Sequence, residues 1–334
     1  MSERLLSLRE LTVGYPMPRT RLAGPRPWFT AVDAVDLEID AGRAVGLVGE
    51  SGCGKSTLAR AILALVEVQS GSIDWRGQPV RRGDEAALRR MRREIQVVFQ
   101  DPVGSLDPRM SIGESVAEAL EALEGRQDGA TARGRVASVL TEVGLDPTLA
   151  GRYPHQLSGG QCQRAAIARA LVGRPKLLIC DEAVSALDVS VQAQIVNLLA
   201  DLRRRHGLAL LFISHNLAVV RHLCDEVAVL YRGRIVERAS SASIFAAPRH
   251  PYTRALLAAV PEPDPAIRAR SAAPELRAAV ATESVAGVGC AYRPRCPLAD
   301  ADCRAEAPRL EDGGSGHLTA CHRARAGTPE GLTR

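Results

Sequence analysis

A segment of nine residues, 49–57, constrains the fold of this chain more than any other feature of the sequence. It reads Gly-Glu-Ser-Gly-Cys-Gly-Lys-Ser-Thr and follows a short apolar run over residues 44–48. Residues 57–66, directly after it, have the apolar content of a buried helix. The spacing G-x-x-x-x-G-K-[ST] between a strand and a helix is typical of a loop that wraps around a phosphate group. The segment therefore predicts a strand, loop and helix unit within an α/β fold.

The rest of the chain favours the same fold class. Further apolar or alternating runs predict strands, at residues 5–13, 32–39, 95–99, 177–180 and 208–213. Residues 189–205 have the pattern of an amphipathic helix, and alternating strands and helices predict a mostly parallel sheet covered on both faces. Residues 111–145 break this alternation, because both of their apolar segments read as helices. We interpret them as a helical insertion.

The loop has the chemistry that phosphate binding requires. Its backbone N–H groups and the helix N-terminus would surround the anion, Lys55 would reach the β- and γ-phosphates, and Ser56 would bind Mg²⁺. Lys55 and Lys176 are the only lysines among 43 basic residues. A lysine retained in the loop indicates a need for a compact charge, whereas Lys176 reads as a surface charge. The predicted nucleotide-binding residues here are Gly49, Ser51, Gly52, Cys53, Gly54, Lys55, Ser56 and Thr57.

Two acidic residues follow the predicted strand at 177–180. Asp181 is placed to hold Mg²⁺, and Glu182 can polarise an attacking water molecule. The competing interpretation is that the pair only caps the next helix. A phosphate-binding loop in the same chain favours the catalytic interpretation.

A second glycine-rich segment, residues 157–161, reads Leu-Ser-Gly-Gly-Gln and precedes an alanine-rich helix. Bare N–H donors at such a helix start would form a second anion site, although Ser158 could equally be an ordinary N-cap. The segment resembles the LSGGQ signature of ABC-type ATPases, and it lies between the loop and the acidic pair, in the order of that family. The signature residues that would contact ATP are Ser158, Gly159, Gly160 and Gln161.

The resemblance to ABC ATPases extends over about the first 250 residues and implies further roles. Gln100 resembles the Q-loop residue that contacts Mg²⁺, Asp188 belongs to the D-loop, and His215 resembles the H-loop histidine that contacts the γ-phosphate. Tyr15 would stack on adenine. The family fold has a P-loop NTPase (RecA-like) core, an N-terminal antiparallel β subdomain and a helical signature subdomain. Two such domains pair head to tail, so that each ATP is enclosed by both.

Other segments are similar to the ATP-binding subunits of bacterial oligopeptide and dipeptide importers, and to the second of their two ATPase subunits. These segments are residues 100–102, 105–110, 152–155, 160–164 and 250–256. The resemblance implies a peripheral subunit on the cytoplasmic face of the membrane, paired with a second ATPase and bound to two permeases. An extracytoplasmic solute-binding protein would take part indirectly. We expect an ATPase domain over residues 1–250, with the insertion at about 101–163, and an extension over 251–334.

Four cysteines in the extension, Cys290, Cys296, Cys303 and Cys321, have the spacing C-x5-C-x6-C-x17-C. A short segment with little apolar content needs a staple, so we expect a small separate module. Four thiolates at this spacing could bind zinc or an iron–sulfur cluster. The remaining alternative is four thiols that bind no metal. Because the importer subunits carry a similar motif associated with a [4Fe-4S] cluster, the resemblance favours the cluster over zinc.

The charge of the chain leaves another function class to consider. A pI of about 8.9 and the basic run at residues 81–93 are compatible with a soluble ABC ATPase that acts on nucleic acid or ribosomes. The run also contains two acidic residues and no aromatic residues, which is typical of a solvated helix face. We therefore expect no nucleic-acid partner. The solute itself is open, because importers of peptides, glutathione, nickel or opines share this ATPase type. Ala183 and Asn216 stand where the family commonly has proline and aspartate.

Overall fold

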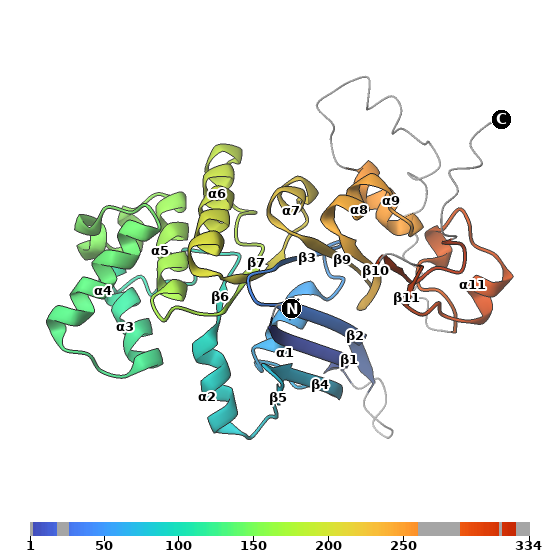
Figure 1. The fold of residues 1–334 in the computed structure, drawn as a ribbon, viewed down its shortest axis with the longest axis horizontal. Coiled ribbons are helices and arrows are strands. Elements are labelled where there is room, and N and C mark those ends of the chain that lie inside the picture. The colour runs from blue at the N-terminus through green and yellow to red at the C-terminus, as the bar shows by residue number, and fades with distance from the viewer. Residues whose placement is uncertain (1–2, 19–26, 260–287, 314–315, 325–334) are drawn as a thin grey trace.

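The computed structural model describes residues 3–18, 27–259, 288–313 and 316–324, and its centre is a sheet of eight strands (Figure 1). The strand order is β11-β12-β10-β9-β3-β8-β7-β6, and the strands from β9 to β6 run parallel. Its strands are β3 (Ala44–Val48), β6 (Ile95–Val98), β7 (Leu177–Asp181), β8 (Ala209–Ile213), β9 (Glu226–Tyr231), β10 (Arg234–Ser240), β11 (Glu311–Asp312) and β12 (Leu318–Thr319). The expected alternation of strands and helices is therefore confirmed.

Strands β3, β7 and β8 are buried along their whole length, as expected for parallel strands covered on both faces. Successive side chains enter two different cores, because a strand has a period of two. Leu178 and Cys180 pack into one core, while Leu177 and Ile179 pack into the other. The first core is covered by α6 (Val189–His206), α7 (Leu217–Leu223) and α8 (Ser241–Ala246), and the second by α1 (Lys55–Ile62) and a smaller sheet (Figure 1).

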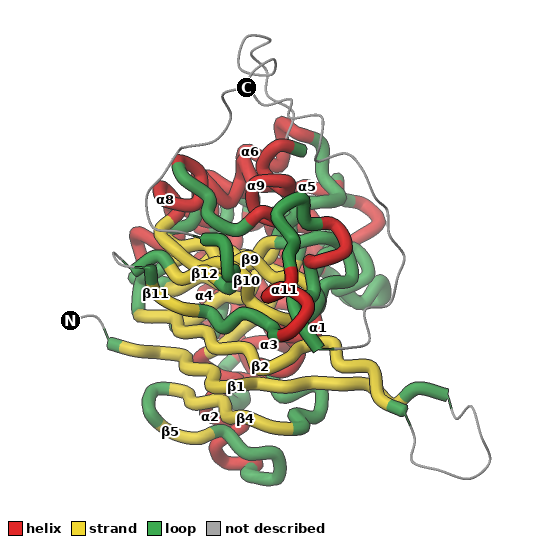
Figure 2. Tube along the Cα trace, turned by 90° about the vertical axis from the view of Figure 1, so that its right-hand side faces the viewer, coloured by secondary structure: helices red, strands yellow, loops and turns green. Residues whose placement is uncertain are grey.

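The smaller sheet is antiparallel, as the resemblance implies, and has the order β2-β1-β4-β5. Its strands are β1 (Arg4–Pro16), β2 (Trp28–Asp40), β4 (Ser70–Trp75) and β5 (Gln78–Pro79), and α2 (Glu85–Glu94) follows them in the chain. Helix α1 contacts β1, β2 and β7, so it lies between the two sheets. Figure 2 shows this small sheet as a separate layer below the main one.

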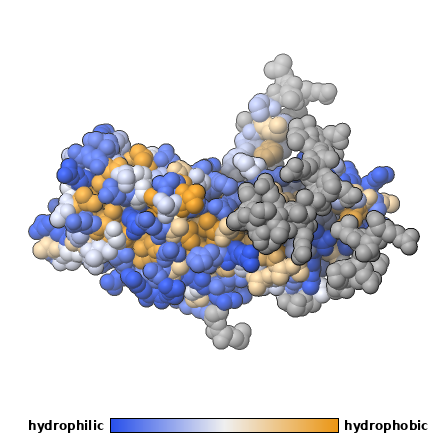
Figure 3. Space-filling model, turned by 90° about the horizontal axis from the view of Figure 1, so that it is seen from above, coloured by the Kyte–Doolittle hydropathy of each residue, from blue (hydrophilic) through white to orange (hydrophobic). Residues whose placement is uncertain are grey.

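The expected helical insertion lies at one end of the molecule (Figure 1). It contains α3 (Ile112–Glu124), α4 (Gly129–Glu142), the 3-10 turns η1 (Pro147–Gly151) and η2 (Pro154–Gln156), and α5 (Gly159–Leu171). Helix α3 begins with a capping box, in which Ser111 and Glu114 each accept a backbone hydrogen bond from the other. Seen from above, hydrophobic side chains gather over this helical half (Figure 3).

The described residues beyond residue 250 are part of the main body, so the prediction of a small separate module is wrong for them. Strands β11 and β12 extend the eight-stranded sheet beside β10, and Tyr252 and Tyr292 are buried in its core. The extension also holds α9 (Pro251–Ala258), η4 (Arg293–Arg295) and α11 (Ala301–Ala305). The low apolar content of this segment predicts that it needs a staple. In the structure, the side chains of Tyr252 and Tyr292 instead anchor its described residues in the main core.

Two further points complete the fold. Much of the expected extension, residues 260–287, lies outside the described residues. Within the part of the chain that the structure describes, no helix combines the length and apolar character needed to cross a membrane.

Candidate phosphate-binding site

The predicted phosphate loop joins the end of β3 to the start of α1, and close backbone contacts require glycine at two of its positions, Gly49 and Gly54. Gly54, the N-cap of α1, has φ +112°, and a Cβ atom there would lie 2.2 Å from the carbonyl oxygen of Ala31. Gly49 is packed as closely against β9, where a Cβ atom would lie 2.2 Å from the carbonyl oxygen of Leu230. No side chain fits at either place, so the loop is fixed against strands of both sheets.

Lys55 is folded over the loop. Its side chain is buried, with the residue 4% exposed, and Nζ donates hydrogen bonds to the carbonyl oxygens of Gly49 (2.8 Å) and Glu50 (2.9 Å). The neighbouring Cys53 is also buried, and burial raises the pKa of its thiol. An ammonium group held by two carbonyl oxygens at the loop can exchange them for phosphate oxygens, which are stronger partners.

Asp181, at the end of β7, lies beside the start of α1. The hydroxyl of Ser56 donates to Oδ1 of Asp181 at 3.0 Å. Burial is the main cause that raises the pKa of Asp181; the hydrogen bond from Ser56 opposes this shift, and the charge of Glu182 adds to it. Two hard oxygen donors at the phosphate loop, one of them a buried carboxylate, fit Mg²⁺.

Glu182 adopts an unusual backbone conformation. It has φ +50°, in the left-handed region that non-glycine residues rarely occupy. Its N–H donates to the carbonyl oxygen of Ile213 at 3.0 Å, and its carboxylate lies 3.6 Å from Nδ1 of His215. Such strain is concentrated at functional sites, at a cost of about 1–3 kcal/mol. The structure therefore brings together Glu182 and His215, two of the three residues, with Gln100, that the sequence predicts for catalysis.

Two more residues were predicted to take part in the ATP site, Gln100 and Tyr15. Gln100 is exposed just after β6, whose last residue, Val98, is paired in register with Cys180 of β7. Tyr15, on β1, places its hydroxyl 3.4 Å from the hydroxyl of Thr57 in the loop. Tyr15 thus contacts the phosphate loop directly, while Gln100 follows the strand that neighbours the one ending at Asp181.

The signature segment begins α5, in the helical insertion. Ser158 and Gln161 form a capping box, in which the Ser158 hydroxyl accepts from the Gln161 N–H and the Gln161 side chain accepts from the Ser158 N–H. Gly160 lies close to α6, since a Cβ atom there would lie 2.6 Å from Val191. Among the described residues, no hydrogen bond or ion pair joins this segment to the phosphate loop. The N-cap interpretation is correct as far as the Ser158 side chain is concerned, while the helix N-terminus stays open to an anion.

Asp188, predicted as the D-loop residue, is the N-cap of α6. Its Oδ1 accepts hydrogen bonds from the hydroxyl of Ser190 and the N–H of Val191. These bonds, led by the one from Ser190, lower the pKa of its carboxyl group. A capping role is thus visible for Asp188.

Comparison with known proteins identifies the family. Residues 32–185 match the family model described as ABC transporter, and residues 236–303 match the one described as Oligopeptide/dipeptide transporter, C-terminal region. The chain is 44% identical over 322 residues to "Oligopeptide transport ATP-binding protein OppF" of Haemophilus influenzae, which covers 96% of this chain and 97% of that protein. The chain belongs to the ABC transporter family.

Two other similar proteins agree with this assignment. "Probable peptide ABC transporter ATP-binding protein y4tS" of Sinorhizobium fredii is 48% identical, over 96% of this chain and 90% of its own length. The solved structure titled "Dimeric structure of a post-hydrolysis state of the ATP-binding cassette MJ0796 bound to ADP and Pi" has a TM-score of 0.63 and 29% identity, over 71% of this chain and 99% of its own. The chain is thus an ABC ATPase, which implies ATP and Mg²⁺.

One prediction for this ABC ATPase, the [4Fe-4S] cluster with zinc as its alternative, is wrong. Cys290, Cys296, Cys303 and Cys321 line one cavity of about 10 Å³, which has room for about one water molecule. Burial is the main cause that raises the pKa of Cys296, to about 11. Within the described residues no group of three or more His, Cys, Asp or Glu side chains could hold a metal ion. The four residues are free cysteines.

The two departures from the family pattern are structurally mild. Asn216 is the N-cap of α7, and its Oδ1 accepts from the N–H groups of Ala218 and Val219. Aspartate would cap the helix in the same way. Ala183 is buried directly after the strained Glu182, and no backbone hydrogen bond from its own N–H is seen among the described residues, so a proline ring there would displace none.

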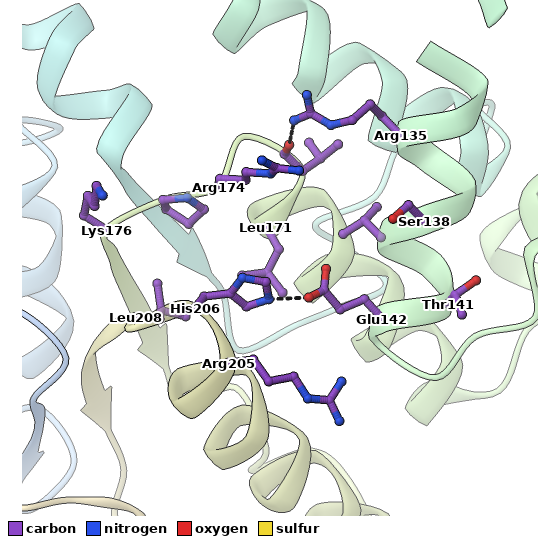
Figure 4. A pocket seen from close by; sticks show the side chains of 13 residues that line it. Arg135, Ser138, Thr141, Glu142, Leu171, Arg174, Lys176, Arg205, His206 and Leu208 are labelled. Atoms are coloured by element: carbon purple, nitrogen blue, oxygen red, sulfur yellow. Dashed lines mark hydrogen bonds and ion pairs between the residues drawn. The ribbon is translucent and has the colours of Figure 1, made fainter. Parts of the chain in front are cut away.

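A large pocket lies away from this site, at the start of β7, whereas Asp181 is at the end of that strand (Figure 4). It has a volume of about 830 Å³ and a rim of basic side chains that includes Arg135, Lys176 and Arg205. The side chains of His206 on α6 and Glu142 on α4 pair across it, joining the helical insertion to the core. No residue that the sequence predicted for ATP lines this pocket. Lys176, read as a surface charge, is indeed exposed.

Three residues with a role at the phosphate loop were not predicted from the sequence. Glu50 belongs to the loop but had no role, while Tyr252 and Arg295 come from the extension and contact Glu50 directly. Tyr252 lies within the segment 250–256, which carried the resemblance to importer subunits without any assigned chemistry. That segment was the available signal.

Proposed function

We propose that this chain is the ATP-hydrolysing subunit of an ABC importer that powers the uptake of oligopeptides or dipeptides. The observation that carries the proposal is the constellation at one edge of the main sheet, where Lys55, Asp181 and Glu182 surround the start of α1. The relatives named for peptide transport extend along almost the whole chain, including the region after residue 236. Among the described residues, we find no feature that favours nucleic acid or ribosomes.

The chemistry follows from the side chains at the loop. The N–H groups at the start of α1 and the ammonium of Lys55 bind the phosphate oxygens of ATP and offset their charge. Ser56 and Asp181, which are joined by a hydrogen bond, would hold Mg²⁺ together with Gln100, and bound Mg²⁺ neutralises charge on the phosphates. Tyr15 would stack on the adenine ring.

Glu182 is the residue that we assign to the attacking water. Its carboxylate would orient the water and accept its proton, while His215, whose Nδ1 lies 3.6 Å from that carboxylate, would contact the γ-phosphate. Glu182 holds its positive φ of +50° directly after the buried strand β7. Hydrolysis thus depends on a carboxylate, and binding depends on the lysine.

The assembly is also part of the proposal. A second ATPase subunit would place its own signature over this ATP, and residues 158–161 with Asp188 would do the same for the partner. Two membrane permeases would dock on the cytoplasmic side, with the solute-binding protein acting on their outer face. The hydrophobic side chains over the helical half are suited to such contacts (Figure 3). We further propose residues 1–250 as the ATPase unit, with the insertion at about 101–163, and residues 251–334 as an extension, the described part of which packs on that unit.

The test uses the complex purified with its permeases and second ATPase, in lipid vesicles. Glu182→Gln is expected to lower ATP hydrolysis and peptide uptake by at least about 100-fold, because water activation is lost, while ATP binding is kept. Glu311→Gln is the control, since Glu311 is an exposed acid in β11. Unchanged hydrolysis in Glu182→Gln would rule out the assigned base. Recovery of the chain with ribosomes or DNA, and not with permeases, would rule out the importer.

A further inference from the structure

Glu50, the second residue of the phosphate loop, is held from three sides. Its N–H donates to the hydroxyl oxygen of Tyr252 at 2.8 Å, and its carbonyl oxygen accepts from Lys55. Its carboxylate receives two hydrogen bonds from the guanidinium of Arg295, at 2.9 and 2.8 Å, one to each oxygen. Tyr252 and Arg295 lie more than 200 residues away in the sequence, so the extension reaches back to the loop.

Both groups are themselves firmly placed. Tyr252 is 1% exposed, and its ring centroid lies 4.5 Å from that of Tyr231 and 5.5 Å from that of Tyr292. The guanidinium of Arg295 lies over the ring of Tyr292, 5.7 Å from its centroid. This contact is favourable, because a cation is attracted to the face of an aromatic ring. The hydrogen bond with Glu50 is the main cause that raises the pKa of Arg295. The aromatic cluster of Tyr231, Tyr252 and Tyr292 thus positions both groups that contact Glu50.

Charge gives these contacts a consequence for ATP. Glu50 is the only acid within residues 49–57, which otherwise bind a strongly negative triphosphate. An unpaired carboxylate at this place would repel the phosphates and leave the loop free to turn. A two-pronged pair with arginine cancels the charge and fixes the direction of the side chain.

We infer that Arg295 and Tyr252 are positioning residues, which hold the phosphate loop through Glu50 in its phosphate-binding conformation before ATP arrives. The inference rests on the proposed function, because it concerns the same ATP site. Neither residue touches the reacting atoms. Their loss weakens the binding of ATP and of the transition state alike, so KM rises while kcat is nearly unchanged.

The test compares Arg295→Gln with Arg323→Gln in the complete complex. Arg323 is a matched control, because it also pairs with carboxylates, Asp300 and Asp302, in the extension but not at the loop. Arg295→Gln is expected to raise the KM for ATP about five- to tenfold, with kcat within about twofold of wild type, the size expected for a charged pair. Arg323→Gln is expected to leave both constants unchanged.

Rescue separates positioning from simple damage to the extension. Arg295→Gln combined with Glu50→Gln removes the unpaired carboxylate, and should recover most of the lost affinity although the pair is absent. Arg295→Lys should be intermediate, because one ammonium cannot replace the planar fork. A double variant no better than Arg295→Gln alone would overturn the inference.

A second measurement does not depend on ATP hydrolysis. Amide hydrogen exchange of the peptide spanning residues 49–57, without nucleotide, should be faster in Arg295→Gln than in Arg323→Gln. If the wild-type complex fails to hydrolyse ATP, the proposed function is wrong, and exchange still decides whether Arg295 holds the loop. Equal exchange in the two variants, or an equal KM where ATP is hydrolysed, would overturn the inference.

Discussion

The phosphate loop and the chain beyond residue 250 differ in how their structure is determined. In the loop, nine consecutive residues between a strand and a helix are sufficient, and Gly49 and Gly54 lie where the pattern requires them. In the extension, the important contacts are pairs far apart in the sequence, such as Glu50 with Arg295, which are 245 positions apart. A site formed by consecutive residues can thus be recognised in the sequence. A contact between residues far apart in the chain leaves no local pattern by which to recognise it.

The largest effect is expected in the loop. Gly54→Ala would bring a Cβ atom within 2.2 Å of the carbonyl oxygen of Ala31, at a residue with φ +112°. The backbone of the loop has to move, which costs about 2–4 kcal/mol of strain and overpacking and should lower ATP affinity by more than about tenfold. ATP affinity and the free energy of unfolding are the measurements.

Gly77→Ala is the control for this prediction. Gly77 also has a positive φ, +75°, but a Cβ atom there would meet nothing within 4 Å. It is expected to cost only the strain of the backbone, about 1 kcal/mol, with ATP affinity unchanged. Equal loss of ATP affinity in the two variants would show that the close contact at Ala31 does not set the shape of the loop.

The same contrast explains how much could be predicted from the sequence. The core strands were predictable because Leu178 and Cys180 face one side of the sheet and Leu177 and Ile179 the other, in an apolar run with no polar break. The phosphate site was predictable because its ligands follow strand ends. Whether the Ser158 side chain acts as a cap or as a ligand was not, because both uses require the same residue types.

The extension was misread because cysteine spacing carries no information on burial. Cys296 and its neighbours surround a space for about one water molecule, which no sequence pattern shows. The β11 and β12 strands have two residues each, too short for any period to be visible. Tyr252 stood in a segment that was recognised only by resemblance, so its contact with Glu50 needed the structure.

The second prediction concerns the anchor of the extension. Glu237 is fully buried on β10, and its carboxylate accepts from the N–H of Arg249 (2.6 Å), the N–H of His250 (3.0 Å) and Nε2 of His317 (2.7 Å). Glu237→Gln would set an amide donor against one of these donors, and should lower the free energy of unfolding by about 2–3 kcal/mol. Urea unfolding measures this loss.

Glu306→Gln is the matched control, since Glu306 is an exposed acid of the same extension. It is expected to change the free energy of unfolding by less than about 0.5 kcal/mol. If Glu237→Gln were equally mild, the extension would be held by its aromatic cluster, and the buried carboxylate would add nothing. Limited proteolysis should then also fail to distinguish the two variants.

The smallest effect depends on pH and on His250, which joins the two regions because it caps the helix that carries Tyr252. Nδ1 of His250 accepts from the Tyr252 N–H at 3.0 Å. Burial, with a smaller contribution from the charge of Arg254, lowers the pKa of His250 from 6.5 to about 4. Between these values the unfolded chain binds a proton that the folded chain does not, so stability is complete above pH 6.5 and falls as the pH drops to about 4.

Each pH unit in this window costs about 1.4 kcal/mol, so at pH 5 the loss from His250 is about 2 kcal/mol. His250→Asn keeps an acceptor at the N-cap and does not titrate. Unfolding in urea at pH 7 and at pH 5 should therefore show a loss that is smaller by about 2 kcal/mol in His250→Asn than in wild type, since the other groups titrate in both. An equal loss in the two proteins would show that protonation of His250 does not cause the loss of stability in acid, because a protonated Nδ1 can no longer accept the Tyr252 N–H.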